Sequence, residues 1–144
     1  MHMSKDPKIL AVLCKWCSYA GADLAGTSRF EYPSNIRIIQ VPCSGRIDPL
    51  MIFKALIDGY DGILISGCHP GDCHYGTGNY FAQRRLAIAR KLLETIGIDP
   101  KRLFFTWISA AEGKRFAEIC ADFHDHLLSL ADSPKALAQE GIDR

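Results

Sequence analysis

The sequence contains no long hydrophobic run and almost no net charge. No apolar segment approaches the roughly 20 residues that a membrane-spanning helix requires. Its 17 basic and 16 acidic residues give a formal net charge of +1, which gives no electrostatic argument for binding nucleic acid or an anionic membrane. The first residues also lack the apolar stretch of a secretory signal. We therefore expect a cytoplasmic protein with no membrane span and no nucleic-acid partner, whose partners are other proteins.

The sequence also lacks the two common phosphate-binding motifs. Neither G-x-G-x-x-G nor G-x-x-x-x-G-K-[ST] follows a strand-like segment, which argues against a bound nucleotide or FMN. Gly71, Gly76 and Gly78 fall instead in one loop, where we expect them to let the backbone approach a bound group closely.

Cysteine is the residue in excess, with six in a chain of 144 residues. Five occur in three short motifs: Cys14 and Cys17 in C-K-W-C, Cys43 in C-S-G-R, and Cys68 and Cys73 in C-H-P-G-D-C-H. In a reducing compartment such thiols stay free for metal binding or redox chemistry. The sixth, Cys120, shares a helical spacing with apolar neighbours, which predicts a core residue.

Four apolar, strand-like runs alternate with helical segments. The predicted strands are residues 9–13, 36–41, 62–66 and 102–108. The predicted helices are residues 18–26, 50–57 and 79–96, and a last helix that begins at a capping box over residues 109–112 and ends near residue 130. Asp48 and Pro49 predict the N-cap and the first residue of the second helix. This alternation predicts an α/β protein.

The expected architecture is a parallel four-stranded sheet of flavodoxin-like order 2-1-3-4 with helices on both faces. The chain length favours a single domain, which we expect over residues 1–130. Residues 131–144 are expected to be a C-terminal tail, either frayed, which is the default for an isolated chain, or a docking arm. Each cysteine motif directly follows one of the first three strands. The fold is therefore expected to gather the motifs at one edge of the sheet, where such folds bind ligands.

Thiolates are soft ligands, and four of them complete either a zinc site or an iron–sulfur cluster. Zinc sites usually pair two C-x₂-C units, whereas only Cys14 and Cys17 have that spacing here. The residues therefore favour an iron–sulfur cluster held by four of the five motif cysteines, and they leave open which cysteine is spare. A structural zinc-binding module is the alternative.

Three polar residues beside the motif cysteines are expected to support the cluster. His69 and His74 each follow a cysteine directly, and we expect them to hydrogen-bond the cluster sulfurs or fix the loop rather than bind metal. Arg46 follows Cys43 closely and is expected either to offset the negative charge of a thiolate-bound cluster, to dock a partner, or to be a solvated surface residue.

Longer stretches around the cysteines resemble the delta subunit of methyl-viologen-reducing (F420-non-reducing) hydrogenase. The resemblance is carried by residues 14–26, residues 37–46, and above all by G-C-H-P-G-D-C-H-Y from residue 67 to residue 75, with Gly78 and Asn79 beyond it. The stretch S-A-A-E-G from residue 109 also fits, so that the resemblance extends over residues 8–128.

This resemblance implies a small [2Fe–2S] electron-transfer subunit of an oxidoreductase complex in methanogens and related anaerobes. In that family the subunit passes electrons from a hydrogenase, or in some organisms a formate dehydrogenase, to the flavin-containing A subunit of heterodisulfide reductase, where electron bifurcation takes place. The family's cysteines carry over onto Cys14, Cys17, Cys43, Cys68 and Cys73. Cys120 lies outside the family's motifs.

A cytoplasmic thiol–disulfide oxidoreductase is the competing hypothesis from a different class. Cys14 and Cys17 form a C-x-x-C dithiol at a predicted helix start, where the thiolate is stabilised. This hypothesis leaves Cys43, Cys68 and Cys73 without a role.

Overall fold

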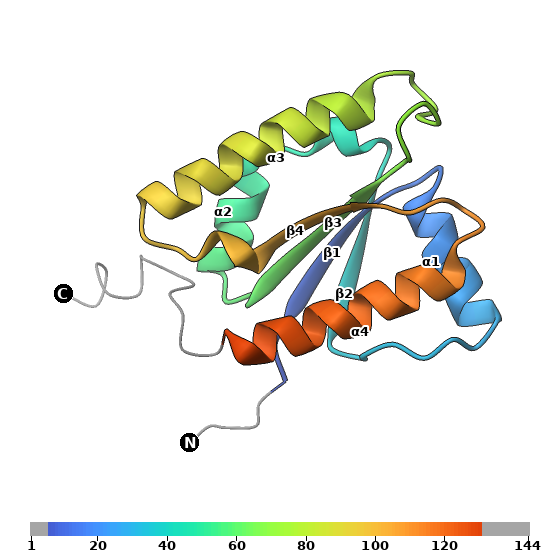
Figure 1. Cartoon of the computed structure of the whole chain (residues 1–144), viewed down its shortest axis with the longest axis horizontal. Helices are drawn as coiled ribbons and strands as arrows, with labels where there is room; N and C mark the ends of the chain where they lie inside the picture. The colour runs from blue at the N-terminus through green and yellow to red at the C-terminus, as the bar shows by residue number, and fades with distance from the viewer. Residues whose placement is uncertain (1–5, 131–144) are drawn as a thin grey trace.

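A computed structural model describes residues 6–130 of the chain. Within that range four strands form one parallel sheet in the order β2-β1-β3-β4, which confirms the predicted order. The strands are β1 (Ile9–Cys14), β2 (Ile36–Val41), β3 (Gly62–Gly67) and β4 (Leu103–Trp107). The order switches between β1 and β3, and β1 ends on Cys14 of the first cysteine motif (Figure 1).

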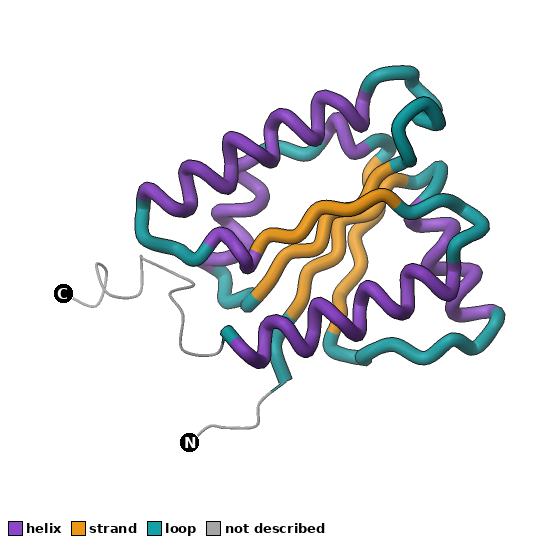
Figure 2. The backbone as a smooth tube through the Cα atoms, viewed as in Figure 1, coloured by secondary structure: helices purple, strands orange, loops and turns teal. Residues whose placement is uncertain are grey.

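Helices cover both faces of this sheet, as predicted (Figures 1 and 2). One face carries α1 (Ser18–Thr27) and α4 (Gly113–Ser129), and the other carries α2 (Pro49–Ile57) and α3 (Gly78–Thr95). The 3₁₀ turns η1 (Ser44–Arg46) and η2 (Pro100–Arg102) precede α2 and β4. None of the helices within residues 6–130 is both long enough and apolar enough to cross a membrane. The tail expected over residues 131–144 lies outside the described residues.

The two central strands are buried along their whole length because almost every residue in them is apolar. Side chains of β1 alternate between two cores. Leu10 and Val12 pack with α2 and α3, whereas Ile9 and Leu13 pack with α1 and α4. Cys120 belongs to the second core and is fully buried, which confirms its predicted place.

The start of α2 is as predicted, but α4 begins later than expected. Asp48 caps α2 by accepting a hydrogen bond from Leu50 N–H at 2.9 Å. Residues 109–112 do not open α4, because Glu112 N–H bonds back to the carbonyl oxygen of Ser109 and closes a separate turn. Only the carboxylate half of the predicted capping box forms, from Ser109 N–H to Glu112 Oε1 at 2.8 Å. The helix then begins at Gly113.

Arg102 joins the start of β3 to the end of α4. Its side chain is buried, and it donates hydrogen bonds to the carbonyl oxygens of Asp61 at 2.8 Å and Leu130 at 2.7 Å. Burial lowers the pKa of Arg102, against the opposing effect of the charge on Asp61. Arg102 therefore holds the start of β3 and the end of α4 together, at the edge of the sheet opposite the cysteine motifs.

We predict that Arg102→Met lowers the free energy of unfolding by about 3 kcal/mol, since two charged hydrogen bonds of roughly 1.5 kcal/mol each are lost. Urea unfolding of the metal-free protein, followed by circular dichroism, measures the change. The control is Lys101→Met at the exposed neighbouring position, which should shift stability by no more than about 0.5 kcal/mol. Equal losses in the two variants would contradict the role of Arg102.

Candidate metal centre

Parallel pairing delivers the cysteine motifs to one edge of the sheet. Cys14, the last residue of β1, pairs with Val41, the last residue of β2, and Cys43 follows two residues later. β3 ends one residue before Cys68. The three loops therefore leave the sheet at the edge toward which the strands point, at the upper right of Figure 1.

Three buried thiols meet at this edge. The sulfurs of Cys14, Cys17 and Cys68 all lie within 4.8 Å of one another, and those of Cys14 and Cys68 are 3.8 Å apart. None of the three residues is more than 6% exposed. Such a group of thiols has the composition and spacing to hold a soft metal ion.

A second pair of thiols lies beside the trio. The sulfurs of Cys43 and Cys73 are 3.8 Å apart. Cys43 is buried at the start of η1, where its sulfur accepts from Gly45 N–H at 3.4 Å, while Cys73 is partly exposed. The Cys14 thiol lies 3.9 Å from the carbonyl oxygen of Pro42, the residue before Cys43, so that the two groups of thiols adjoin.

Gly78, at the start of α3, leaves space for the second pair. A Cβ atom at this position would overlap the sulfur of Cys43 and would lie 3.4 Å from the sulfur of Cys73. Gly45 meets the same helix start, because a Cβ atom there would lie 2.9 Å from the Cα of Gly78. Backbone without side chains therefore forms one wall of the site, as expected for Gly78. Gly71 and Gly76 instead have positive φ angles, and a Cβ atom on either would have no neighbour within 4 Å.

Hydrogen bonds within the trio separate the acidities of its thiols. A hydrogen bond from Cys17 lowers the pKa of Cys14 to about 6, against the opposing effect of burial. The same contact, together with burial, raises the pKa of Cys17. Burial raises the pKa of Cys68 to about 11. Cys14 is therefore the member of the trio that loses its proton most readily.

The second pair shows the same contrast. Burial raises the pKa of Cys43. Burial would also raise the pKa of Cys73, but the backbone N–H groups of Asn79 and Tyr75 lower it by a larger amount. The pKa of Cys73 therefore lies below its ordinary value. The first turn of α3 thus stabilises a thiolate at Cys73, as expected for a helix N-terminus.

Asn79 holds the loop that follows β3. This side chain is fully buried, and its Nδ2 donates to the carbonyl oxygens of Cys68 at 3.0 Å and His69 at 3.1 Å. Its Oδ1 accepts from Tyr80 N–H at 3.0 Å. The sequence placed Asn79 at the start of a helix and among the residues that carry the family resemblance, but it did not predict that this side chain holds the Cys68 loop.

His69 meets a carboxylate rather than a sulfur. Its Nε2 lies 2.5 Å from Oε1 of Glu112, and this hydrogen bond, with a further one from Ser109 N–H, lowers the pKa of Glu112 to about 2. The contact ties the Cys68 loop to the turn before α4. We expected His69 either to hydrogen-bond the cluster sulfurs or to fix the loop, and its contact with Glu112 fixes the loop. Glu112, predicted only as a capping residue, was missed as a neighbour of the site.

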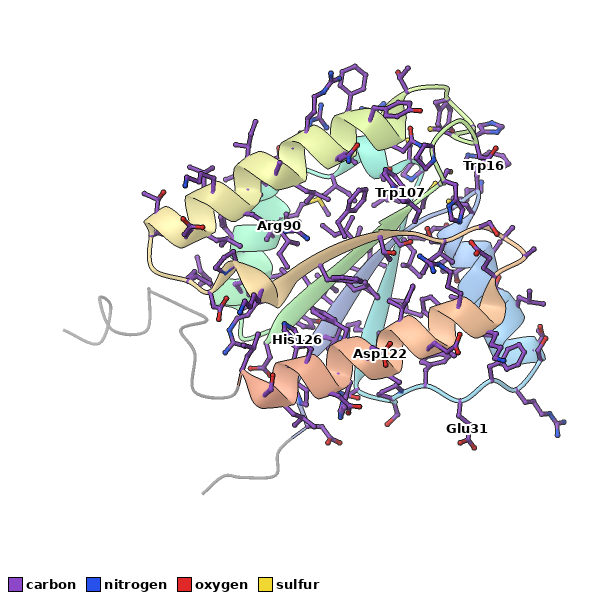
Figure 3. All side chains as sticks on the ribbon, in the orientation of Figure 1. Trp16, Glu31, Arg90, Trp107, Asp122 and His126 are labelled. Carbon is purple, nitrogen blue, oxygen red and sulfur yellow. The ribbon has the colours of Figure 1, made fainter. Side chains whose placement is uncertain are left out.

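His74 is part of an exposed aromatic group that joins two cysteine loops. Its ring stacks on Trp16 with centroids 3.8 Å apart and lies edge-on to Tyr75 at 4.9 Å. Trp16 Nε1 also donates to the Tyr75 hydroxyl at 3.3 Å. Figure 3 shows Trp16 at the end of the molecule to which the strands point. The group therefore bridges the loops that follow β1 and β3.

Arg46 lies at a pocket that opens beside the second thiol pair. The pocket has a volume of about 470 Å³, and its walls include Cys43, Arg46, Tyr75 and Phe81. Arg85 from α3 donates to the carbonyl oxygen of Gly45 in the same wall. The surface nearest to Cys43 therefore combines arginine side chains with exposed aromatic rings.

A comparison with protein families matches residues 9–131 to the family FlpD, described as methyl-viologen-reducing hydrogenase, delta subunit. The iron-sulfur D subunit of an F420-non-reducing hydrogenase from Archaeoglobus profundus is 48% identical over 118 residues, which are 82% of this chain and 86% of that protein. The vhc iron-sulfur D subunit of the F420-non-reducing hydrogenase of Methanococcus voltae is 49% identical over 125 residues, 87% of each chain.

The chain is also similar to part of a longer protein. The A subunit of the ferredoxin:CoB-CoM heterodisulfide reductase of Methanosarcina mazei is 45% identical over 139 residues, which are 96% of this chain but only 18% of that protein. The family match covers most of the described residues, and the two iron-sulfur subunits are nearly half identical to this chain over most of its length. The chain therefore belongs to the delta-subunit family of methyl-viologen-reducing hydrogenase.

Proposed function

We propose that this chain is a non-catalytic [2Fe–2S] electron-transfer subunit. It relays electrons from a hydrogenase or a formate dehydrogenase to the flavin-containing A subunit of heterodisulfide reductase, within an electron-bifurcating complex in the cytoplasm of a methanogen. The names of its relatives support the coarser part of this proposal, because they include iron-sulfur subunits of hydrogenases and the A subunit of a heterodisulfide reductase.

The spacing of two thiol pairs carries the proposal. Two thiolates that bind one tetrahedral metal ion at about 2.3 Å lie about 3.8 Å apart. The sulfurs of Cys14 and Cys68 are 3.8 Å apart, and so are those of Cys43 and Cys73. In a [2Fe–2S] cluster each of the two irons takes two protein ligands. Two adjoining pairs with this spacing therefore suit a two-iron cluster better than a single zinc ion.

Under this pairing, Cys14 and Cys68 would hold one iron, and Cys43 and Cys73 would hold the other. Cys17 is then the spare thiol. Its sulfur lies 3.4 Å from the hydroxyl of Ser18 and within 4.8 Å of the sulfur of Cys14. A protonated thiol in this position can support the neighbouring ligand.

The bound cluster supplies one-electron chemistry, and the chain's own residues set the conditions for it. Gly45 N–H donates to the sulfur of Cys43, and neighbouring backbone N–H groups lower the pKa of Cys73. Such donors stabilise negative charge on the sulfurs. The burial of Cys14 and Cys68 excludes water from this pair of thiols. The partial exposure of Cys73 leaves a short path for electrons to a partner.

A thiol–disulfide oxidoreductase is the second candidate, and one observation favours it. The pKa of Cys14 is lowered to about 6 by its contact with Cys17, as in C-x-x-C redox enzymes. Cys14 is nevertheless only 1% exposed, whereas the attacking thiol of such an enzyme has to reach its substrate. The buried position of this dithiol makes it the weaker candidate.

Single cysteine-to-alanine variants, purified without oxygen, test the proposed function. Cys43→Ala is expected to reduce bound iron and acid-labile sulfide by about ten-fold or more, because residues that merely support a metal ligand are already worth about 10–100-fold in metal affinity. Cys17→Ala is expected to keep both iron and sulfide, and so is Cys120→Ala, whose side chain lies in the α1/α4 core.

Loss of the cluster in Cys17→Ala with retention in Cys43→Ala would refute the ligand assignment. Protein that contains zinc or no metal, and whose thiol–disulfide exchange activity survives Cys43→Ala but not Cys17→Ala, would support the second candidate instead.

We further predict that Gly78→Ala reduces iron content by about ten-fold, because its methyl group would overlap the sulfur of Cys43. Iron analysis and visible absorption measure the loss. Gly26→Ala in α1 is the control, since a Cβ atom there has no neighbour within 4 Å. Normal iron content in Gly78→Ala would show that the site does not need the close approach of α3.

A further inference from the structure

The first turn of α3 touches both groups of thiols. Gly78 leaves space for the sulfur of Cys43, and a Cβ atom on it would also lie 3.4 Å from the sulfur of Cys73. The next residue, Asn79, holds the carbonyl oxygen of Cys68 through its side chain. The first turn of α3 therefore links the loop that carries Cys68 to the pair formed by Cys43 and Cys73.

The hydrogen bonds of the Asn79 side chain are fully used within the protein. Its amide group donates to the carbonyl oxygens of Cys68 and His69, and its carbonyl oxygen accepts from Tyr80 N–H. Asn79 is fully buried, and its bond to Cys68 forms away from water, where an unmade bond costs about 1–3 kcal/mol. The amide is therefore held in one orientation.

A second contact restrains the same loop from the opposite side. Asn79 fixes the main chain of His69, while Glu112 binds the ring of His69 at 2.5 Å. The loop that carries Cys68 is thus fastened to α3 by its backbone and to the turn before α4 by a side chain. Cys73, five residues further along the same loop, has its sulfur 3.8 Å from that of Cys43, and a Cβ atom on Gly78 at the start of α3 would lie 3.4 Å from it.

We propose that Asn79 is a positioning residue that holds the Cys68 loop against the start of α3, where Cys43 and Cys73 lie beside Gly78, at the separation required by a two-iron cluster. The proposal rests on the proposed function, because it takes the two pairs as the ligands. Asn79 touches no metal. It acts through its side chain, which fixes the main-chain carbonyl groups of Cys68 and His69.

The test uses Asn79→Asp, which keeps the size of the side chain and the acceptor for Tyr80 N–H. It replaces the amide donor by an oxygen that faces the carbonyl oxygens of Cys68 and His69. Asn79→Ser is the second variant, because a hydroxyl group can still donate one hydrogen bond. Asn35→Ala is the control: Asn35 also donates through its side chain, to the carbonyl oxygen of Pro7, but lies at the opposite edge of the sheet.

The first readout is the binding of Co²⁺ to the metal-free protein, followed by the absorption bands of cobalt–thiolate bonds. Affinity is expected to fall by about 10–100-fold in Asn79→Asp, the range typical for residues that orient metal ligands, and by less in Asn79→Ser. It should be unchanged in Asn35→Ala. The second readout is the midpoint potential and EPR spectrum of protein loaded with iron and sulfide, which should shift in both Asn79 variants but not in the control.

The outcomes separate the two proposals. Wild-type protein that takes up neither iron nor Co²⁺ overturns the proposed function itself. Wild-type protein that takes up iron and sulfide, with Asn79 variants that match it in Co²⁺ affinity, potential and EPR spectrum, overturns only the positioning role. A loss of Co²⁺ affinity in Asn35→Ala as large as that in Asn79→Asp also overturns it, because the effect would then follow from stability alone.

Discussion

The parallel pairing of β1 with both β2 and β3 is the constraint on which the site depends. Because these strands are parallel, their carboxyl ends lie at the same edge of the sheet. Each cysteine motif at the end of a strand therefore lies beside the others. The register pairs Cys14 with Val41 and Leu13 with Ser66, which brings the residues after β2 and β3 beside the end of β1. A slip of one residue would turn the Cys14 side chain to the other face of the sheet. The two cores that fix this register therefore also fix the thiols.

The cores and the site contribute to stability in different ways. The α/β layers bury apolar side chains on both faces of the sheet and have no need of a metal. The cysteine edge gathers five thiols, and the pKa of the buried Cys68 is raised by its surroundings while that of Cys14 is lowered by a neighbouring thiol. Metal binding requires these thiols to lose their protons, so a bound cluster would add to folding stability and would release protons. The fold places the five thiols close together, and a bound metal would stabilise that arrangement.

Much of this arrangement follows from local sequence patterns. The continuous apolar runs identified β1 and β3, Asp48 and Pro49 marked the start of α2, and the position of each cysteine after a strand predicted the common edge. The contacts that were missed join residues far apart in the sequence. Asn79 reaches back to Cys68, and Glu112 reaches His69, 43 residues earlier. The capping box at residues 109–112 forms only in part: the Glu112 carboxylate accepts from Ser109 N–H, but Glu112 N–H bonds to the carbonyl oxygen of Ser109 rather than to its hydroxyl.

The central claim is that four of these thiols hold a [2Fe–2S] cluster. Iron and acid-labile sulfide analysis of the wild-type protein purified without oxygen, combined with EPR spectroscopy after reduction, tests it most directly. We predict about two irons and about two sulfides per chain, with the spectrum of a reduced [2Fe–2S] cluster. Protein that holds zinc or no metal after anaerobic loading with iron and sulfide would contradict it.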